Sequence, residues 1–244
     1  MKSKLTLLAL LISVTIYAQN WKPLFNGKNL DGWEVKCVEK DKNKGYWKVD
    51  NGSILCDTKG NTDHQYIWLQ TNEEFSDFEL RLKFQASRKM TGNAGVQVRS
   101  RYDENAQVDG DVIGWLDGIQ IDINPIDPFR NGYIYDETRT ERRWINPSLP
   151  DWKISKEKYA PKKIIYYSDD EGPQWNDMRI ICKGMQITTF VNNVKVSDYD
   201  GTGILDNEGH KKYNVSTKGH IALQLHKKSN NFIRYKDIEF REFD

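Results

Sequence analysis

The residues best suited to chemistry near the end of the chain share one face of a single expected strand, Gly219–His226. Aliphatic residues alternate there with small or polar ones, which is typical of a strand with one face in a core. The opposite face then carries Gln224 and His226. Because histidine titrates near neutral pH, His226 could exchange a proton with a bound molecule. The strand is therefore predicted to present chemistry rather than to face bulk water.

The same alternation puts polar side chains on the matching face of three other segments, Gly95–Arg99, Gly118–Ile123 and Gly132–Tyr135. Their outward-facing members are Gln97, Arg99, Gln120, Asp122, Tyr133 and Tyr135. A solvated strand face normally carries Lys, Glu and Thr, as Phe78–Phe84 and Phe232–Phe240 do. The contrast predicts a concave sheet that faces a ligand.

This face offers both proton transfer and binding of oxygen atoms. His226 or Asp122 could move a proton, and Arg99 could stabilise a developing oxyanion. Gln120 could hold a carbonyl or hydroxyl oxygen. The structural alternatives are a salt bridge between Arg99 and Asp122 and a half-buried, hydrogen-bonded His226. Strands far apart in the sequence place polar side chains on the same face by the same alternation, and this agreement favours a ligand site.

Strand-like segments with turn signals recur along the chain, and amphipathic helical patterns are absent. Trp47–Val49 and Ser53–Cys56 flank an Asp-Asn-Gly turn, and Met178–Cys182 leads through a Lys-Gly turn into Gln186–Val191. Many short strands of this kind predict an all-β antiparallel sandwich or barrel in one domain. Residues 136–171 have weak periodicity and are predicted to form a long excursion of loops.

The first 18 residues have the features of an export signal. Lys2 and Lys4 precede the apolar run Leu5–Tyr17, and Ala18 is a small residue before the expected cut. The run is too short to span a membrane. The mature domain is therefore expected to be residues 19–244, exported to the periplasm or the outside of the cell.

The composition narrows the classes of partner. The chain has 36 Lys and Arg against 35 Asp and Glu, so its formal charge of +1 becomes −1 without the two signal lysines, which argues against nucleic acid. Aromatic residues make up 12% of the chain and are typical either of a core of large rings or of platforms for sugars. Three cysteines, Cys37, Cys56 and Cys182, are too few for a disulfide scaffold and are interpreted as small buried hydrophobes.

An ordered set of short motifs spans nearly the whole mature chain. The motifs are Leu24–Trp33, Trp47–Gly52, Phe78–Leu80, Asn93–Arg99, Gln120–Asp122, Gly132–Tyr135, Gln174–Asn176, Val191–Asn192 and Gly219–His226. In this order they resemble the family of 3-keto-disaccharide hydrolase domains, formerly called domain of unknown function 1080. The resemblance implies an exported, concanavalin A-like jelly-roll sandwich that acts on glycosides whose sugar is oxidised at C3.

One position departs from the family pattern. The family often has an acidic residue two positions before the Gln of its central motif, where this chain has Gly118, with Asp117 beside it. Either Asp117 takes that role through a shifted backbone, or the carboxylate is absent.

A ketone at C3 would make the C2 proton acidic, so a base could remove it and expel the C1 substituent. The hypothesis gives the base role to His226, binding of the ketone or enolate to Arg99 and Gln120, and the acid role to Asp122 or Tyr135. The other substrate-binding candidates are Gln97, Tyr133, Trp175, Gln224 and Asp117.

Rival functions use the same face differently. A conventional glycosidase needs two carboxylates flanking the bond, and this face offers only Asp122 and Asp117. A non-catalytic carbohydrate-binding module would work through exposed rings and tolerate loss of His226. A divalent metal ion held by His226 and Asp122 is a further option. The loop Asp198–Asp206 lacks the closing Glu of an EF-hand and is interpreted as a turn.

Overall fold

The computed structural model describes residues 21–87, 92–108, 110, 112–125, 130–148, 151–158 and 174–243. The expected export signal and part of the expected loop excursion lie outside these ranges. Strands dominate the described residues, which contain one α-helix, α1 (Glu208–Tyr213), and two short 3-10 helices, η1 (Glu39–Asp41) and η2 (Lys156–Lys158).

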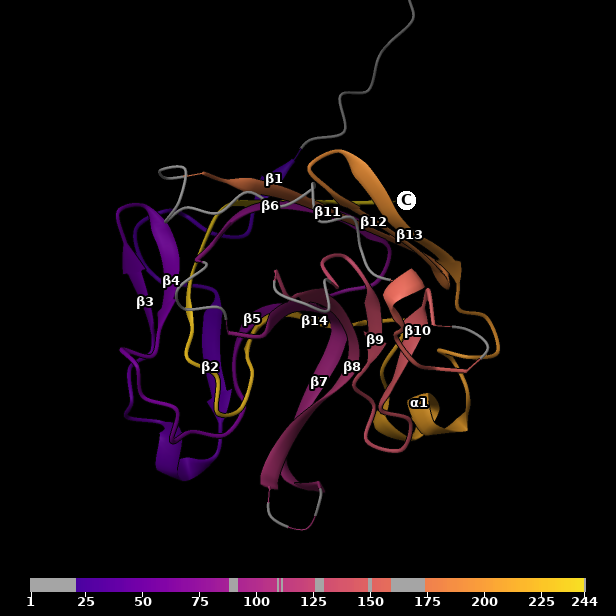
Figure 1. The fold of residues 1–244 in the computed structure, drawn as a ribbon, viewed down its shortest axis with the longest axis horizontal. Helices are drawn as coiled ribbons and strands as arrows, with labels where there is room; N and C mark the ends of the chain where they lie inside the picture. Colours follow the sequence, from indigo (N-terminus) through magenta and orange to yellow (C-terminus); the bar gives the residue numbers. More distant parts are fainter. Residues whose placement is uncertain are drawn as a thin grey trace, which may run out of the picture.

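Two antiparallel sheets form the molecule, and the larger one arches over the smaller in Figure 1. The larger sheet has the order β13 (Val194–Asp200), β12 (Gln186–Val191), β11 (Asn176–Lys183), β6 (Phe78–Ala86), β15 (Phe232–Glu242), β4 (Ser53–Asp57) and β3 (Trp47–Asp50), with β1 (Lys22–Pro23) paired to β15. The smaller sheet has the order β10 (Arg143–Asn146), β9 (Ile134–Asp136), β8 (Val112–Ile123), β7 (Ala94–Val108), β14 (Gly219–Leu225), β5 (Ile67–Phe75) and β2 (Trp33–Cys37). The prediction of an all-β antiparallel sandwich is confirmed.

Alternating side chains build the core between the sheets. In β11, Met178, Ile180 and Cys182 are buried while the residues between them are more exposed, as a period of two requires. The three cysteines are free and buried, which confirms their interpretation as small hydrophobes.

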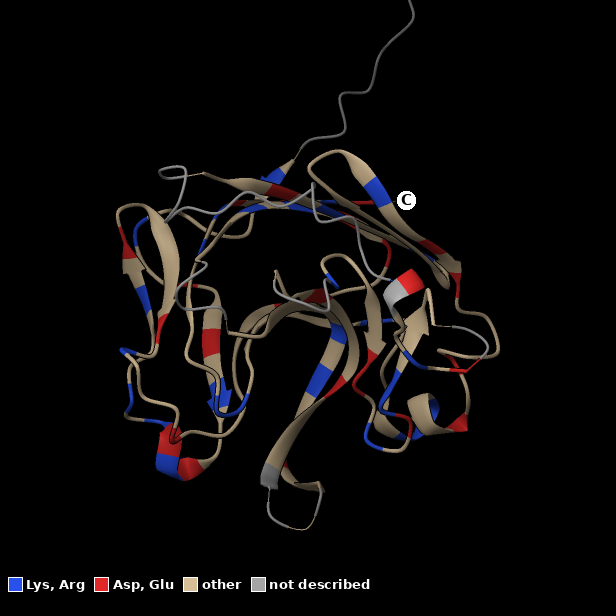
Figure 2. Ribbon diagram, in the orientation of Figure 1, with Lys and Arg blue, Asp and Glu red and all other residues tan. Residues whose placement is uncertain are grey.

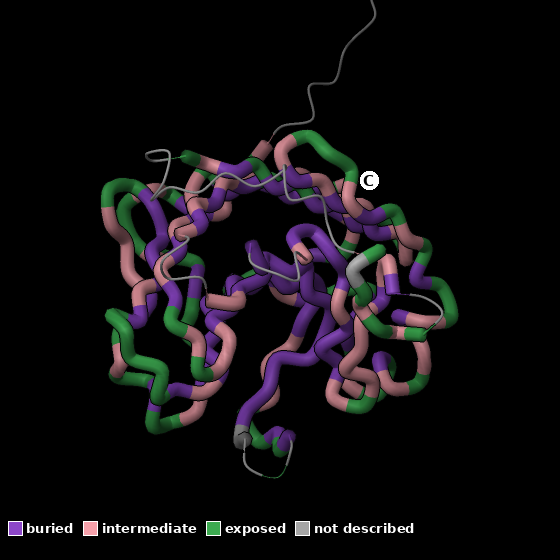
Figure 3. Tube along the Cα trace, in the orientation of Figure 1, coloured by how far each residue is buried: buried purple, intermediate pink, exposed green. Residues whose placement is uncertain are grey.

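The β7–β8 hairpin is longer than its neighbours and projects from the sandwich in Figure 1. Two register shifts along the ladder bend it, as β-bulges do. The bend brings Trp115 onto Tyr66 and Trp68, and the three rings share a second buried cluster outside the main core. Near the sheet the hairpin is buried (Figure 3). It therefore acts as a wall on the outer face of the smaller sheet.

Charged residues of both signs are interspersed over both sheets (Figure 2). Many of them pair across strands, as Lys83 does with Asp177 at 2.6 Å. Among the residues that the structure describes, no helix has the length and apolar character needed to cross a membrane.

Candidate active site

A cavity of about 210 Å³ opens on the outer face of the smaller sheet. Its lining residues are Tyr66, Asn93, Gln120, Asp122, Arg130, Tyr135, Glu137, Arg142, Trp144 and His226. Four of them, Gln120, Asp122, Tyr135 and His226, are residues that strand alternation predicts for this face. Segments far apart in the sequence thus meet at one site, as the alternation of their polar side chains predicts.

His226 is held as a neutral ring with an unprotonated Nε2. Its Nδ1 lies 2.9 Å from the carbonyl oxygen of Lys227, and because a carbonyl only accepts, Nδ1 carries the proton. Nε2 lies 3.0 Å from the hydroxyl of Tyr66, which therefore donates to it. Burial lowers the pKa of His226 below its ordinary value of 6.5. The ring is thus in the state that a general base needs at neutral pH.

Glu137 is a cavity residue that the sequence patterns do not reveal. It directly follows β9, in the segment expected to form loops, and its side chain is buried. Nε2 of Gln224 donates to its Oε1 at 3.3 Å. Burial raises the pKa of Glu137 to about 7, an effect that the hydrogen bond from Gln224 opposes. A carboxyl group with this pKa can give or take a proton at neutral pH.

Asp122 is engaged in a buried ion pair. Arg130 Nε donates to its Oδ2 at 2.9 Å, and Gln120 Nε2 donates to its Oδ1 at 3.1 Å. Burial raises the pKa of Asp122, and the charge of Arg130 opposes that rise. The amide of Gln120 lies across Gly95, where an added Cβ would come within 2.7 Å of it. Gly95 therefore makes room for Gln120.

Two arginines supply positive charge to the cavity, and both are held against aromatic rings. The guanidinium of Arg142 lies 5.2 Å from the ring centroid of Trp115, and that of Arg130 lies 5.1 Å from that of Trp144. Tyr135 meets Trp144 edge-on at 4.8 Å. Burial raises the pKa of Tyr135 to about 12, so its hydroxyl keeps its proton at neutral pH.

An aromatic cluster supports the two titratable groups. Tyr66 stacks on Trp68 with ring centroids 5.6 Å apart and meets the ring of His226 edge-on at 4.7 Å. Trp115 of the hairpin contacts Tyr66 at 5.0 Å, and its Nε1 donates to the backbone carbonyl of Glu137 at 2.7 Å. The hairpin therefore helps to position both His226 and Glu137.

Arg99 does not line the cavity, so the alternation rule fails at this residue. Its backbone is left-handed, with φ of 51°, beside a register shift in the β7–β8 ladder. A bulge of this kind redirects a side chain. The guanidinium is fully buried, and its partners are the carbonyl oxygens of Ser76, Gly184 and Ser216, at 2.6, 2.6 and 2.9 Å, and the carboxylate of Asp77 at 2.9 Å. Arg99 therefore ties strand ends together.

Replacing Arg99 with Ala is expected to lower the free energy of unfolding by about 3–5 kcal/mol, because three backbone carbonyl groups lose hydrogen bonds from a buried charged donor. Urea unfolding would measure the loss. Lys83→Ala is the matched control, since its ion pair with Asp177 is exposed and is expected to contribute less than about 1 kcal/mol. A loss for Arg99→Ala no larger than that of the control would contradict this structural role.

Two predicted substrate-binding rings lie away from the cavity. Tyr133 is buried, and its hydroxyl donates to the backbone carbonyl of Lys158. Trp175 adjoins β11 of the larger sheet, where the ammonium of Lys236 lies 4.3 Å from its ring centroid. Neither ring is a wall of this cavity.

Two predicted amides are buried close to the cavity. Gln97 lies opposite Gln120 in the β7–β8 ladder, and neither polar atom of its side chain has a partner among the described residues. Gln224 bonds to Glu137 through Nε2, while its Oε1 is likewise unpartnered within that part of the chain. Buried polar atoms without partners cost free energy, so a polar ligand or ordered water beside them would be stabilised.

The backbone at position 118 leaves no room for the carboxylate that the family often has there. Gly118 has φ of +135°, and a Cβ there would lie 2.8 Å from the Cα of Ser100, so no side chain fits. Asp117 is no substitute, because Arg139 holds its carboxylate at 2.8 Å and it does not line the cavity. Glu137, whose N–H donates to the Gly118 carbonyl at 2.8 Å, directly follows the neighbouring strand β9 and places a carboxyl group in the cavity. Glu137 is thus a carboxyl group in the cavity that neither alternative includes.

The donors in the cavity do not form a ready metal site. Within the described ranges, no three His, Cys, Asp or Glu side chains are grouped to hold a metal ion. Of the two expected ligands, Asp122 is engaged by Arg130. No catalytic step is therefore derived through a metal.

Fold and cavity together define a two-sheet antiparallel sandwich with a cavity lined by titratable side chains on the outer face of one sheet. The chain belongs to the 3-keto-alpha-glucoside-1,2-lyase-like domain family, whose model matches residues 20–241. The family expected from the ordered motifs is thereby confirmed.

Solved structures share this fold at low sequence identity. Two crystal structures from Parabacteroides distasonis ATCC 8503 are described as candidate glycosyl hydrolases. One is 18% identical, with a TM-score of 0.55 over 93% of this chain and 95% of that one. The other is 23% identical, with a TM-score of 0.53 over 92% and 100%. A Bacillus subtilis protein of unknown function with a galectin-like fold is 12% identical, with a TM-score of 0.54 over 87% and 90%. No curated protein matches the chain.

Proposed function

We propose that this chain cleaves glycosides whose sugar carries a ketone at C3, by removing the C2 proton and eliminating the C1 substituent, with net hydrolysis. Family membership supports a carbohydrate-related function. The observation that carries the proposal is the presence in one cavity of a neutral histidine, His226, and a carboxyl group with a pKa of about 7, Glu137. Elimination needs such a base and such an acid at the same pH.

In the first step, the substrate displaces the Tyr66 hydroxyl from Nε2 of His226. Nε2 then takes the proton from C2, and the electron pair of the C–H bond delocalises onto the ketone oxygen as an enolate. The positive charge of Arg142, and not that of Arg99, stabilises this oxygen. Asp122 does not act as the acid in this scheme. Its ion pair instead positions Gln120 and Arg130 around the sugar.

In the second step, the enolate electrons return to form the C1–C2 double bond, and the bond from C1 to the leaving oxygen breaks. Glu137 gives its proton to that oxygen; the hydroxyl of Tyr135 is the second candidate donor. Water then adds across the double bond. Its oxygen joins C1, its proton goes to the carboxylate of Glu137, and protonated His226 returns a proton to C2. The product is the free 3-keto sugar, and both side chains regain their initial states.

The test is incubation of the protein with a 3-keto-glucoside and with its unoxidised parent, with and without a chelator. Ultraviolet absorbance would follow a conjugated enone, and chromatography would follow the free sugar. Turnover of the keto substrate alone is expected. Turnover of the parent would point to a conventional glycosidase that uses Asp122 and Glu137. Binding of both sugars without turnover would make the chain a carbohydrate-binding module, and inhibition by the chelator would contradict the metal-free scheme.

A further inference from the structure

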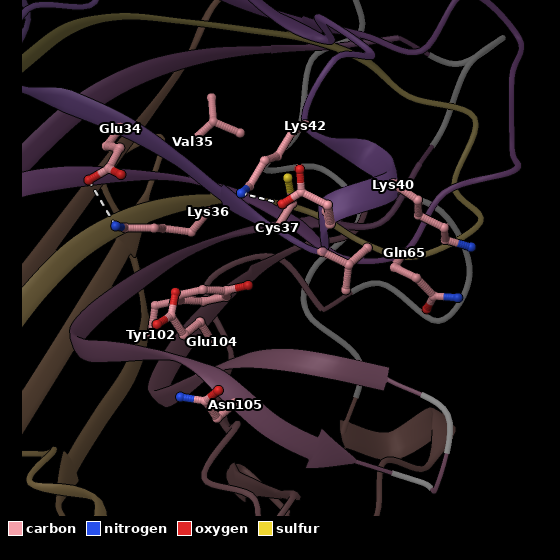
Figure 4. Close-up of a pocket in the computed structure, with 12 residues that line it drawn as sticks. Glu34, Val35, Lys36, Cys37, Lys40, Lys42, Gln65, Tyr102, Glu104 and Asn105 are labelled. Atoms are coloured by element: carbon pink, nitrogen blue, oxygen red, sulfur yellow. Dashed lines mark ion pairs between the residues drawn. The ribbon is translucent and has the colours of Figure 1, made fainter.

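A second and larger cavity, of about 640 Å³, lies between β2 with η1 and the β7 strand of the long hairpin. We name it the β2 groove; it is formed by Glu34–Lys40, Lys42, Gln65, Tyr102, Glu104 and Asn105. In Figure 4, Tyr102 and Asn105 of β7 lie across the cavity from the residues of β2 and η1. Its volume is in the range of sites that bind small molecules.

The lining of the β2 groove suits a molecule with an apolar face and polar edges. Tyr102 supplies an aromatic ring, and Val35 is unusually exposed for an aliphatic residue, at 39%. Around them lie groups able to bind hydroxyls, including the ion pair of Glu34 with Lys36 at 2.8 Å. Oε1 of Gln65 is buried and has no partner among the described residues. A sugar ring offers the complementary surface, with C–H groups on its faces and hydroxyls around its edge.

The charges of the β2 groove select against a charged ligand. Three lysines and three glutamates line it, so the two signs cancel. Two of these pairs are already formed, Glu34 with Lys36 and Glu39 with Lys42. A phosphate, sulfate or uronate would need an excess of positive charge that this lining does not have. The groove therefore fits a neutral polyhydroxylated molecule.

The β2 groove and the candidate active site are neighbours along the aromatic cluster. Tyr102, in the groove, contacts Trp68 at 5.9 Å, and Trp68 stacks at 5.6 Å on Tyr66, which lines the active-site cavity. Gln65 of the groove also precedes Tyr66 directly in the chain. A molecule on Tyr102 is thus connected through Trp68 to Tyr66, whose hydroxyl bonds to His226.

We propose that the β2 groove binds further, unoxidised units of a neutral oligosaccharide whose oxidised residue occupies the active-site cavity. This inference rests on the proposed function and extends the substrate from a simple 3-keto-glucoside, which the active-site cavity holds alone, to an oligosaccharide that carries such a unit. The groove holds sugar units that take no part in bond cleavage. Its binding of unoxidised chains is therefore independent of His226.

Isothermal titration calorimetry of the intact protein tests the groove without any turnover. The probes are neutral gluco-oligosaccharides of one to four units, α- and β-linked, with an oligo-uronate for comparison. In at least one series, the affinity for the oligosaccharide is expected to rise by about tenfold or more between one sugar unit and four. The oligo-uronate is expected to bind more weakly than the neutral chains. Lys36→Ala and Glu104→Gln should each weaken the affinity for the tetrasaccharide by about fivefold or more.

Two variants serve as controls. Lys48→Ala removes a lysine of similar character, paired with Asp57 at 3.5 Å on the larger sheet, and should leave binding unchanged. His226→Ala should also keep the affinity for the unoxidised chain. The inference would be overturned if no oligosaccharide binds or if the affinity does not depend on chain length. It would also be overturned if His226→Ala is the only one of these variants that loses binding. If the tetrasaccharide binds in the groove while no 3-keto-glucoside is cleaved, the proposed function fails and the groove assignment stands.

Discussion

Replacing His226 with Ala is expected to lower kcat/KM for a 3-keto-glucoside by about 10²–10⁴-fold, the range that a positioned general base contributes. The reason is that His226 lines the same cavity as Glu137 and that burial lowers the pKa of its ring, which keeps the ring neutral at pH 7. Steady-state kinetics on the purified variant would measure the loss.

The control for this variant lies on β14, the strand that His226 directly follows. His220→Ala removes a histidine whose Nδ1 bonds to the backbone carbonyl of Thr71 at 2.8 Å and which does not line the cavity. Its kcat/KM should stay close to that of the unmodified chain. If His226→Ala turns over at the same rate as His220→Ala, the C2-proton mechanism is wrong.

Replacing Glu137 with Gln is expected to have the second largest effect, a fall in kcat of about 10²-fold or more from loss of the acid that protonates the leaving oxygen. The unmodified chain should lose activity as pH rises through about 7, because Glu137 must be protonated to act. On the acid side, activity should fall as His226 becomes charged, and burial moves this limb to a pH lower than is ordinary for histidine because it lowers the pKa of the ring. Glu137→Gln should lose the alkaline limb and keep the acid one. A profile whose alkaline limb survives in the variant would assign the acid role elsewhere.

The same substitution has a consequence for stability whose sign follows from the pKa. The folded chain holds the proton of Glu137 up to a pKa of about 7, against an ordinary value of 4.5, so stability is lost as pH rises between these values. The difference corresponds to on the order of 3 kcal/mol. Above pH 7, Glu137→Gln should therefore unfold at higher denaturant concentration than the unmodified chain. Glu208→Gln, at an exposed carboxylate, should show no such gain.

Much of the candidate site could be predicted from strand alternation. Gln120, Asp122, Tyr135 and His226 reach one cavity because regular strands send every second side chain to the same face. The fold class follows from the same patterns, since short alternating strands with turns leave few architectures other than a sandwich or barrel. The catalytic roles of these residues stay predictions.

Other residues could not be found in this way, for identifiable reasons. Arg99 lies in a bulge, and a bulge is a feature of pairing between strands that one strand's sequence does not record. Tyr66 precedes β5, whose first five residues, Ile67–Thr71, are all buried, so the period of two is erased there. Glu137 lies beyond a strand of only three residues, too short to show any period.

The backbone geometry at Gly118 has a consequence for how relatives of this chain are compared. Any classification that scores the residue type at this column of an alignment would count the chain as lacking a carboxylate, because Ser100 leaves no space for a side chain there. Yet Glu137, hydrogen-bonded to Gly118 across the strand boundary, brings the same functional group into the cavity. Equivalent carboxyl groups within such a family are then better identified by their location in space than by their position in the sequence. In an alignment, such an exchange would show as two columns, from neighbouring segments of the sheet, whose residues change together.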